Sequence, residues 1–390
     1  MKTMKPTVCA LLAAALVLVL SCGKDGREMS PIPRGIPPGR AIVDPGIAER
    51  DSSGIYVLSD NDSVLVLYRN QKAVRTISKE KSARDGGAWL AGGHVYVIWS
   101  ADSVTHVQKD GKDLFSYRGR ERISGFLARG GEVHTLGAGE SGKGITYRID
   151  GVGVMENPSG AVLGNPEDSV WPGALLGTDG ETVCFSYMTG RGTGRKWYLC
   201  EDGEERAVRI PGYVDKVFDL RRIAGKICYV CNTRLNPYLA EIHAGDKVVQ
   251  CEHGGADSVS DCSLLPLGGE LYAKGLRHFP GGRSYRTLWG SDGKIVDSGA
   301  AVADYYTDGG NIASVSASKD GTVVGIHVSG RSYGPEDGIL PSRRAAAYLR
   351  DTLYLALEPS SPSFNPCVWR NGARLALPRG DRILSIEIVK

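Results

Sequence analysis

Short apolar runs recur along this chain at intervals of about 42 residues. Each run opens a unit that reads as an apolar strand, a turn, a second apolar strand, an Asn-Gly or Asp-Gly turn and a third strand. One unit covers residues 54–58 and 64–71, and another covers residues 351–355 and 367–372. A strand-based period of roughly 40–50 residues is typical of small sheets repeated around an axis.

The first strand of each unit, here called the anchor strand, is the clearest part of the repeat. Its copies begin at or beside Gly54, His94, Glu132, Thr182, Lys226, Glu270, Asn311 and Thr352. Asp-Gly and Asn-Gly are the strongest short-range hairpin signals, and they occur at Asp110, Asp150, Asp202, Asp292 and Asn371. A fourth strand that leads into each anchor completes a four-stranded antiparallel blade of a β-propeller.

The repeat therefore predicts an all-β fold over residues 41–390, a β-propeller of four-stranded antiparallel blades with eight blades. Residues 383–389 form a last apolar strand, which we expect to complete the first blade and to remove its free edge. Seven blades are the alternative, because the copy at Asn311 is degenerate and residues 47–54 can supply a fourth strand. Residues 343–350 are the strongest helical candidate, but their place in the repeat favours a strand.

Residues 1–21 have the pattern of a bacterial lipoprotein signal peptide. Lys2 and Lys5 precede an uncharged apolar run at residues 8–20, which is too short to span a bilayer. A small residue, Ser21, then precedes Cys22, as in the lipobox where a signal peptidase cuts and the cysteine carries the lipid. An ordinary secretory signal with a chance cysteine is the alternative. Gly23 after the cysteine resembles the pattern of outer-membrane sorting.

Residues 22–40 contain four prolines among glycines and charges, which predicts an extended tether rather than a folded segment. The formal charge of the chain is +3, and two of those charges lie in the signal peptide. This charge gives no reason to expect nucleic-acid binding. We expect a monomer in the cell envelope, most simply at the outer membrane, held by the lipid on Cys22 and carrying no cofactor.

The pattern of apolar-Tyr-apolar, a hairpin, and apolar-Trp-x-Asn-Gly resembles the repeats of β-propeller lipoproteins from Bacteroidetes-type bacteria. The resemblance rests on residues 67–70, 288–293 and 368–372, and it covers most of the chain after Arg40. It implies a fold rather than a chemistry, since those proteins are mostly of unassigned role. Gln71 departs from the pattern by replacing the turn glycine, and the middle repeats lack the tryptophan.

Residues 137–144 look like a phosphate-binding loop, but Gly144 stands where such a loop needs Ser or Thr. The segment also leads into an expected strand rather than a helix, so we interpret it as a hairpin. The seven histidines show no H-x-x-H or H-E-x-x-H spacing, and no metal site is predicted.

Besides Cys9 in the signal segment and Cys22, the chain has seven cysteines, at positions 184, 200, 228, 231, 251, 262 and 367. Cys228 and Cys231 have C-x-x-C spacing, yet residues three apart on a strand face opposite sides, so we expect neither a redox site nor a zinc site there. We interpret these cysteines as small buried apolar residues. Disulfides between Cys184 and Cys200, or between Cys251 and Cys262, are the alternative.

The connections after the anchor strands lengthen in the later units, at residues 189–195, 277–283 and 358–366. Equivalent loops of successive blades lie on one face of a propeller, where a rigid scaffold positions them for function. The predicted ligand-binding residues on that face are Arg191, Arg195, Arg277, His278, Arg283, Tyr285 and Arg331. Such a patch suits an anionic or glycan ligand, and ordinary solvated turns are the alternative.

These observations favour a membrane-tethered envelope protein that binds a protein or glycan partner, or acts as a scaffold, through one face of the propeller. The sequence predicts no catalytic residue. The alternative is a carbohydrate-active hydrolase or lyase of the envelope with its active site at the central face. Two carboxylates about 5–10 Å apart in the centre would favour that enzyme.

Overall fold

The computed structural model describes residues 41–42, 53–61, 63–78, 84–139, 144–157, 161–162, 177–179, 182–190, 194–234, 239–334, 336, 338–340, 345–358, 366–377 and 382–389. All of them belong to one unit, Pro38–Lys390. The predicted signal peptide and the whole tether, including Cys22, lie outside the described residues. Among the described residues, no helix is long and apolar enough to cross a membrane.

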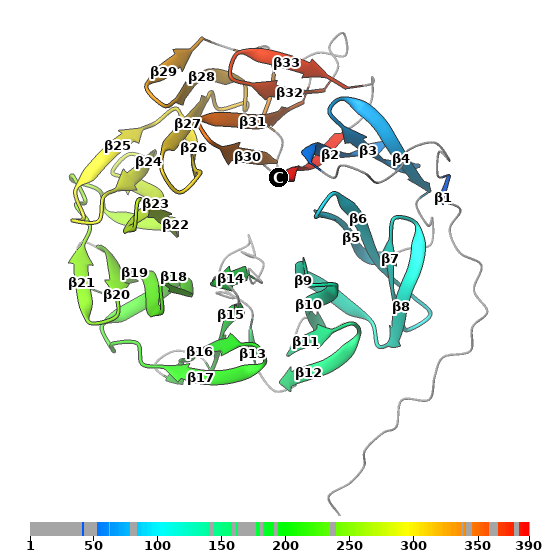
Figure 1. Ribbon diagram of the computed structural model, residues 1–390. Helices are drawn as coiled ribbons and strands as arrows, with labels where there is room; N and C mark the ends of the chain where they lie inside the picture. The colour runs from blue at the N-terminus through cyan, green and yellow to red at the C-terminus, as the bar shows by residue number, and fades with distance from the viewer. Residues whose placement is uncertain are drawn as a thin grey trace, which may run out of the picture. The chain divides into compact units, whose positions relative to one another are not determined.

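The described strands form eight separate antiparallel sheets, the blades, which are arranged in a ring (Figure 1). The strands of each blade are given from the inner to the outer one. Blade 1 consists of β34 (Arg382–Val389), β2 (Gly54–Asn61), β3 (Val64–Arg69), β4 (Lys72–Ser78) and the added β1 (Ala41–Ile42), and blade 2 of β5 (Arg84–Ala91), β6 (His94–Ala101), β7 (Val104–Lys109) and β8 (Lys112–Arg118). Blade 3 consists of β9 (Glu121–Arg129), β10 (Glu132–Gly139), β11 (Ile145–Ile149) and β12 (Val152–Asn157), and blade 4 of β14 (Gly177–Asp179) with β13 (Ala161–Val162), β15 (Thr182–Thr189), β16 (Lys196–Glu201) and β17 (Glu204–Val208).

Blades 5 to 8 follow the same order and contain four strands each. They consist of β18 (Val214–Ile223), β19 (Lys226–Thr233), β20 (Ala240–Ala244) and β21 (Lys247–Gln250); β22 (Ser258–Leu267), β23 (Glu270–Phe279), β24 (Arg283–Trp289) and β25 (Ile295–Gly299); β26 (Val302–Thr307), β27 (Ile312–Ala317), β28 (Val323–Val328) and β29 (Arg331–Tyr333); and β30 (Ala346–Leu349), β31 (Thr352–Leu357), β32 (Cys367–Arg370) and β33 (Ala373–Ala376). The prediction of an eight-bladed β-propeller is confirmed, and every anchor strand is the second strand of its blade.

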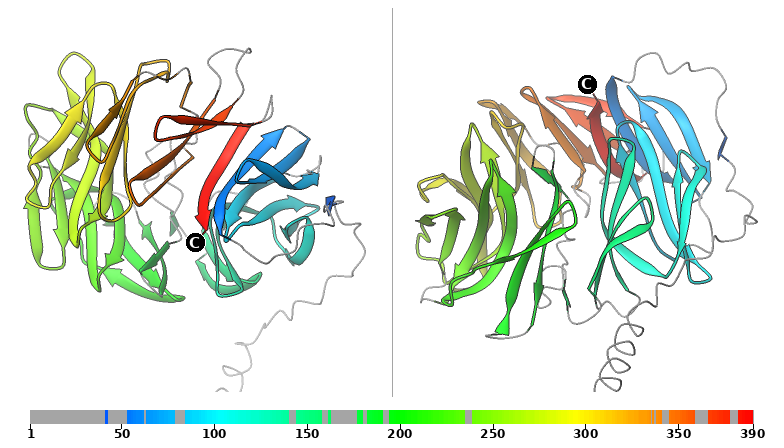
Figure 2. Two further views of the ribbon diagram at one scale, coloured as in Figure 1. Left: turned by 45° about the horizontal axis from the view of Figure 1, so that its top comes forward. Right: turned by 60° about the horizontal axis from the view of Figure 1, so that its bottom comes forward.

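The last strand of the chain lies in the first blade. β34 pairs antiparallel with β2, with Val389 opposite Gly54 and Arg382 opposite Asp60, and the two strands run side by side in Figure 2. The inner edge of β2 is thereby covered, and its backbone groups find partners in β34. The alanine-rich segment that carried the strongest helical signal contains strand β30, as the repeat predicted.

The Asp-Gly and Asn-Gly turns join the third and fourth strands of their blades, and in four of them the Asp or Asn side chain ties the turn back to the anchor strand. Asn70 in the Asn-Gln turn of blade 1 does the same, whereas Asp292 accepts from the N–H of Lys294 within its own turn. In five blades the Asp or Asn Oδ1 atom accepts a hydrogen bond from the backbone N–H of the second anchor residue. The pairs, with N···O distances, are Asn70–Ile55 (3.0 Å), Asp110–Val95 (3.0 Å), Asp150–Val133 (2.9 Å), Asp202–Val183 (2.8 Å) and Asn371–Leu353 (3.1 Å). The repeated dipeptide therefore fixes the end of the blade as well as the turn.

The tyrosine of the apolar-Tyr-apolar pattern faces a basic residue on the third strand. Arg69, Lys109 and Arg370 each lie over the ring of the tyrosine directly opposite, with the charge 5.7–5.9 Å from the ring centroid. Each basic residue immediately precedes the Asn or Asp of the turn. Cross-strand contacts of this kind stabilise a blade modestly and help to fix its register.

Apolar side chains gather between neighbouring blades, in contacts that we call seams and name by the two blades. Each of the eight seams has its own buried cluster. Trp289 in seam 5/6 and Trp369 in seam 7/8 are fully buried. Stability is thus distributed around the ring, as in other repeat architectures where each unit packs on its neighbours.

The cysteines behave as the sequence predicted. The seven described cysteines, from Cys184 to Cys367, are buried and form no disulfide. Cys228 packs in seam 5/6 and Cys231 in seam 4/5, so the C-x-x-C pair points to opposite faces of β19. The phosphate-loop lookalike joins β10 to β11, which pair antiparallel with Gly137 opposite Thr146, and the hairpin interpretation is confirmed.

Candidate functional site

The predicted ligand-binding residues do not form one patch. Arg191 lies outside the described residues. The guanidinium of Arg195 donates from Nη1 to the carbonyl oxygen of Asp215 at 2.8 Å, which ties blade 4 to blade 5. Arg331 opens β29 directly after the β28–β29 turn. Because strand directions alternate, a turn between third and fourth strands lies at the opposite end of the blade from the loops considered above, so Arg331 is misplaced in that set.

The other four residues belong to the β23–β24 hairpin of blade 6. Arg277 pairs with Tyr285 across the hairpin, and Phe279 pairs with Arg283. Alternation along the strands therefore places Arg277, Phe279, Arg283 and Tyr285 on one face of the hairpin and His278 on the other. Near the tip, Arg283 is exposed, and the partly buried rings of Phe279 and Tyr285 lie with centroids 4.8 Å apart.

Arg277 is buried rather than exposed, which corrects the expectation that it lies in a surface loop. Its side chain is 4% exposed and donates three hydrogen bonds. Nε reaches Thr287 Oγ1 at 2.8 Å, Nη1 reaches the carbonyl oxygen of His253 at 2.8 Å, and Nη2 reaches Ser298 Oγ at 2.7 Å. Burial lowers the pKa of Arg277. Arg277 therefore stabilises the hairpin through these buried hydrogen bonds and is not available to contact a ligand.

His278 points to the other face of the hairpin. Its Nε2 atom lies 2.8 Å from Ser260 Oγ, and its Nδ1 atom lies 2.9 Å from Ser284 Oγ. Both ring nitrogens are therefore engaged within blade 6. The exposed surface that remains from the predicted set is the tip with Arg283, Phe279 and Tyr285, which we call the blade-6 tip.

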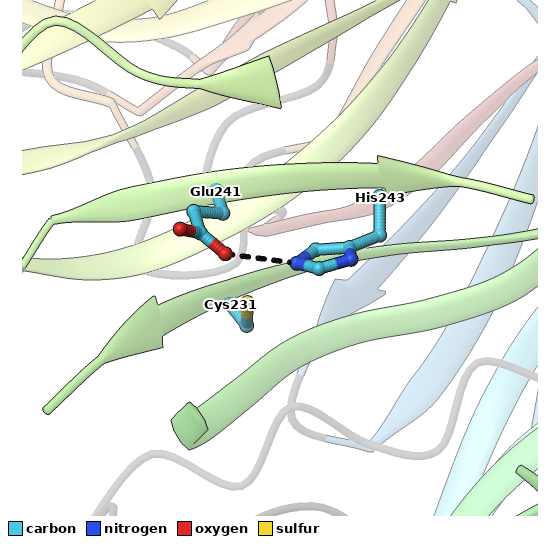
Figure 3. A group of neighbouring side chains, drawn as sticks. All are labelled: Cys231, Glu241 and His243. Carbon is cyan, nitrogen blue, oxygen red and sulfur yellow. Dashed lines mark hydrogen bonds and ion pairs between the residues drawn. The ribbon is translucent and has the colours of Figure 1, made fainter. Parts of the chain in front are cut away.

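A second group of chemically reactive side chains lies in seam 4/5, and the sequence analysis missed it. Cys231, Glu241 and His243 bring their sulfur, carboxylate oxygen and ring nitrogen atoms within 4.8 Å of one another (Figure 3). All three side chains are buried, with exposures of 0%, 6% and 3%. We call this group the blade-5 cluster.

The pairing of β19 with β20 assembles the blade-5 cluster. Cys231 lies directly opposite Glu241, and Tyr229 lies opposite His243. Residues two apart share a face of a strand, so all four side chains point into seam 4/5. Glu-x-His on a strand was the available sequence signal. Its partner Cys231 depends on the register between strands, which one sequence does not reveal.

Hydrogen bonds and ring stacking hold the cluster in place. His243 Nε2 lies 3.0 Å from Glu241 Oε2, and the hydroxyl of Tyr213 donates to the same oxygen at 3.2 Å. The Tyr229 ring stacks on His243 with centroids 4.2 Å apart. Burial raises the pKa of the Cys231 thiol and lowers the pKa of His243, and both shifts favour the neutral form of the group.

A cavity of about 200 Å³ lies in seam 8/1, against the side chains of Gln71, Val368 and Arg370. Small-molecule sites usually enclose roughly 300–1,000 Å³. This cavity is therefore smaller than the usual site for a metabolite, and the blade-6 tip and the blade-5 cluster are the better candidates.

No protein-family model matches the chain, and no match to a curated protein was found. Among solved structures, the chain is similar to the dihydro-heme d1 dehydrogenase NirN in complex with DHE, with a TM-score of 0.55 and 11% identity over 97% of this chain and 86% of that chain. A prolyl endopeptidase structure is similar at a TM-score of 0.48 and 14% identity, over 80% of this chain and 56% of that chain. At such identities the likeness to NirN shows the fold alone.

Proposed function

We propose that this chain is a lipid-anchored protein of the cell envelope that binds an acidic glycan through the blade-6 tip. The observation that carries the proposal is the exposed Arg283 beside the Phe279–Tyr285 ring pair, on a hairpin supported by the buried Arg277. Fixed side chains lose little conformational entropy on binding, so a rigid tip is a better binding surface than a flexible loop.

The residue types at the blade-6 tip match this class of ligand. A guanidinium offers a planar fork of N–H donors that fits carboxylate and sulfate groups. Aromatic rings supply large apolar contact area, and Tyr and Arg are enriched among the residues that dominate binding energy. Together they suit a sugar ring that carries an anionic group.

The test is direct binding of polygalacturonate, an acidic polysaccharide, by the full chain. We expect Arg283→Ala and Tyr285→Ala each to weaken binding about tenfold, because loss of a dominant contact costs about 1.4 kcal/mol or more. Arg331→Ala is the matched control, since it removes an exposed arginine at the other end of a blade. Absence of binding, or an equal loss in the control, would contradict the proposed site, and capture of an envelope protein instead would favour a protein partner.

The membrane anchor is proposed on sequence grounds, from Cys22 directly after the apolar run at residues 8–20. We expect Cys22→Ala to move the protein from the membrane fraction to the soluble fraction of the envelope. Cys9→Ala is the control, because Cys9 lies within the apolar run and receives no lipid in this scheme. Retention of the Cys22→Ala protein at the membrane would refute the anchor.

The alternative of a hydrolase or lyase would need an acid and a base that are free to meet a substrate at the central face. Four carboxylates of the described inner strands, Glu121, Asp219, Asp304 and Glu387, join neighbouring blades. They accept hydrogen bonds from the Tyr117 hydroxyl, the Leu264 N–H, the Lys274 ammonium and the N–H groups of Gly92 and Gly93, respectively. These four groups serve structure instead.

A further inference from the structure

We propose that Cys231, Glu241 and His243 form a zinc site inside seam 4/5. The three side chains offer a thiolate sulfur, a carboxylate oxygen and an imidazole nitrogen, which are the ligand types that Zn²⁺ prefers. The site lies in blade 5 and is independent of the glycan-binding proposal for blade 6. A failure of either proposal therefore leaves the other standing.

The geometry is close to what zinc requires. Zinc bonds of about 2.0–2.3 Å in tetrahedral geometry place the ligand atoms about 3.4–3.6 Å from one another. In the blade-5 cluster, His243 Nε2 and Glu241 Oε2 are 3.0 Å apart, and all three ligand atoms lie within 4.8 Å of one another. Small side-chain rotations suffice to reach the bound geometry, because the paired strands β19 and β20 already set the backbone positions.

The charge balance also favours a divalent ion. Binding replaces the thiol proton of Cys231 with the metal, so the Zn–S bond forms and one proton leaves to solvent. The thiolate and the Glu241 carboxylate then carry two negative charges, and His243 coordinates through Nε2 as the neutral imidazole. The hydrogen that Nε2 shares with Glu241 in the metal-free cluster is exchanged through solvent to Nδ1, so the net release stays at one proton. The bound site is neutral overall, which limits the cost of burying charge in a seam where these residues are at most 6% exposed.

The surroundings supply a supporting residue and a route in. The Tyr229 ring stacks on His243 with an interplanar angle of 11°, which restricts rotation of the imidazole. Tyr213 is 40% exposed, and its hydroxyl reaches the Glu241 carboxylate from the solvent side. In this proposal the fourth ligand is that hydroxyl or a water molecule, and the ion enters when the Tyr213 side chain moves aside.

The test titrates the full chain, stripped of metal by a chelator, with Zn²⁺ and with Co²⁺ as a spectroscopic probe. We expect one Zn²⁺ per chain, and with Co²⁺ a thiolate-to-cobalt charge-transfer band in the near ultraviolet. Cys231→Ser should abolish the band, and His243→Gln should weaken Zn²⁺ binding at least about 100-fold, since even supporting residues of metal sites contribute 10–100-fold.

Two matched variants serve as controls. Cys228→Ser removes a buried thiol from the other face of the same strand, and His134→Gln removes a buried histidine stacked on a tyrosine in blade 3. Both should bind zinc like the unmodified chain. A folded unmodified protein without the cobalt band would overturn the proposal whatever the variants do. Equal loss of binding in Cys228→Ser and Cys231→Ser would place the site elsewhere.

Discussion

The two faces of blade 5 are built from the same two strands, yet they have opposite chemistry. The face in seam 5/6 is almost wholly apolar: Cys228, Val230 and Ile242 pack with Cys251 and against Cys262 and Trp289 of blade 6. The face in seam 4/5 carries Cys231 with Glu241 and His243. Thiols three residues apart in the sequence therefore have different roles, since strand geometry separates them and the neighbouring strand supplies their partners.

This comparison predicts that the apolar face dominates stability and that the polar face carries specific chemistry. The apolar side chains gain from leaving water roughly in proportion to their area. The polar groups cost free energy on burial unless each finds a partner, and in seam 4/5 Glu241 is bonded to both His243 and Tyr213.

The largest effect is expected from Trp289→Ala in seam 5/6. The indole is fully buried and donates from Nε1 to the carbonyl oxygen of Glu252 at 2.8 Å. The substitution should lower the free energy of unfolding by about 3–5 kcal/mol in urea denaturation and leave zinc binding per folded chain unchanged. Val248→Ala, at a 50% exposed position on blade 5, should change it by less than about 0.5 kcal/mol. Similar losses in both variants would contradict a seam-based core.

A second effect compares the same substitution on the two faces. Cys251→Ser places a hydroxyl in the apolar seam 5/6 and should cost about 1–3 kcal/mol of unfolding free energy without metal. Cys231→Ser should cost less, because the new hydroxyl lies opposite the Glu241 carboxylate and can donate a hydrogen bond to it. Denaturation curves of the two variants in chelator decide the point, and a larger loss for Cys231→Ser would reverse our ranking of the faces.

A smaller effect is expected from Tyr213→Phe. The change removes the 3.2 Å hydrogen bond to Glu241 and keeps the ring in place. Because Tyr213 is partly exposed, the loss should be about 0.5–1.5 kcal/mol, measured by thermal or urea unfolding. Unchanged stability would show that His243 alone satisfies the carboxylate.

The smallest expected effect is on how the free energy of unfolding changes with pH, and it involves His134 in blade 3. Burial lowers the pKa of His134 below its usual 6.5, so the folded protein keeps this ring neutral while the unfolded chain takes up a proton. Its contribution to stability is therefore present above about pH 6.5 and declines as the pH falls further. His134→Gln should flatten this part of the stability curve, and an identical slope in both proteins would show that His134 does not contribute.

Much of the architecture could be predicted from the sequence because its signals are local. The Asp-Gly turn at Asp110 marks a hairpin by its own chemistry, and its Oδ1 atom then bonds the N–H of Val95 in the adjoining strand. Gln71 departed from the repeat and adopts a positive φ of 72°, so this turn forms without the glycine that usually favours it. The other turns of the repeat likewise fix which residues of neighbouring strands lie opposite each other within a blade.

The sites could be predicted only in part. The blade-6 hairpin was found from its loop, but the burial of Arg277 depends on contacts with His253, Thr287 and Ser298, which the sequence does not reveal. Arg331 was grouped with that hairpin from its residue type, although strand direction sends it to the other end of its blade.

The sequence by itself determined an all-β ring of eight four-stranded blades, since a repeated local pattern specifies each blade and the terminal strand completes the first. It also determined that the C-x-x-C cysteines face apart, because alternation is a property of any strand. Only the tertiary structure decided what each face meets. Cys231 gained Glu241 and His243 as neighbours through the register of β19 on β20 and the closure of seam 4/5. Contacts between strands and blades are set by packing over distance, and no spacing within one chain segment encodes them.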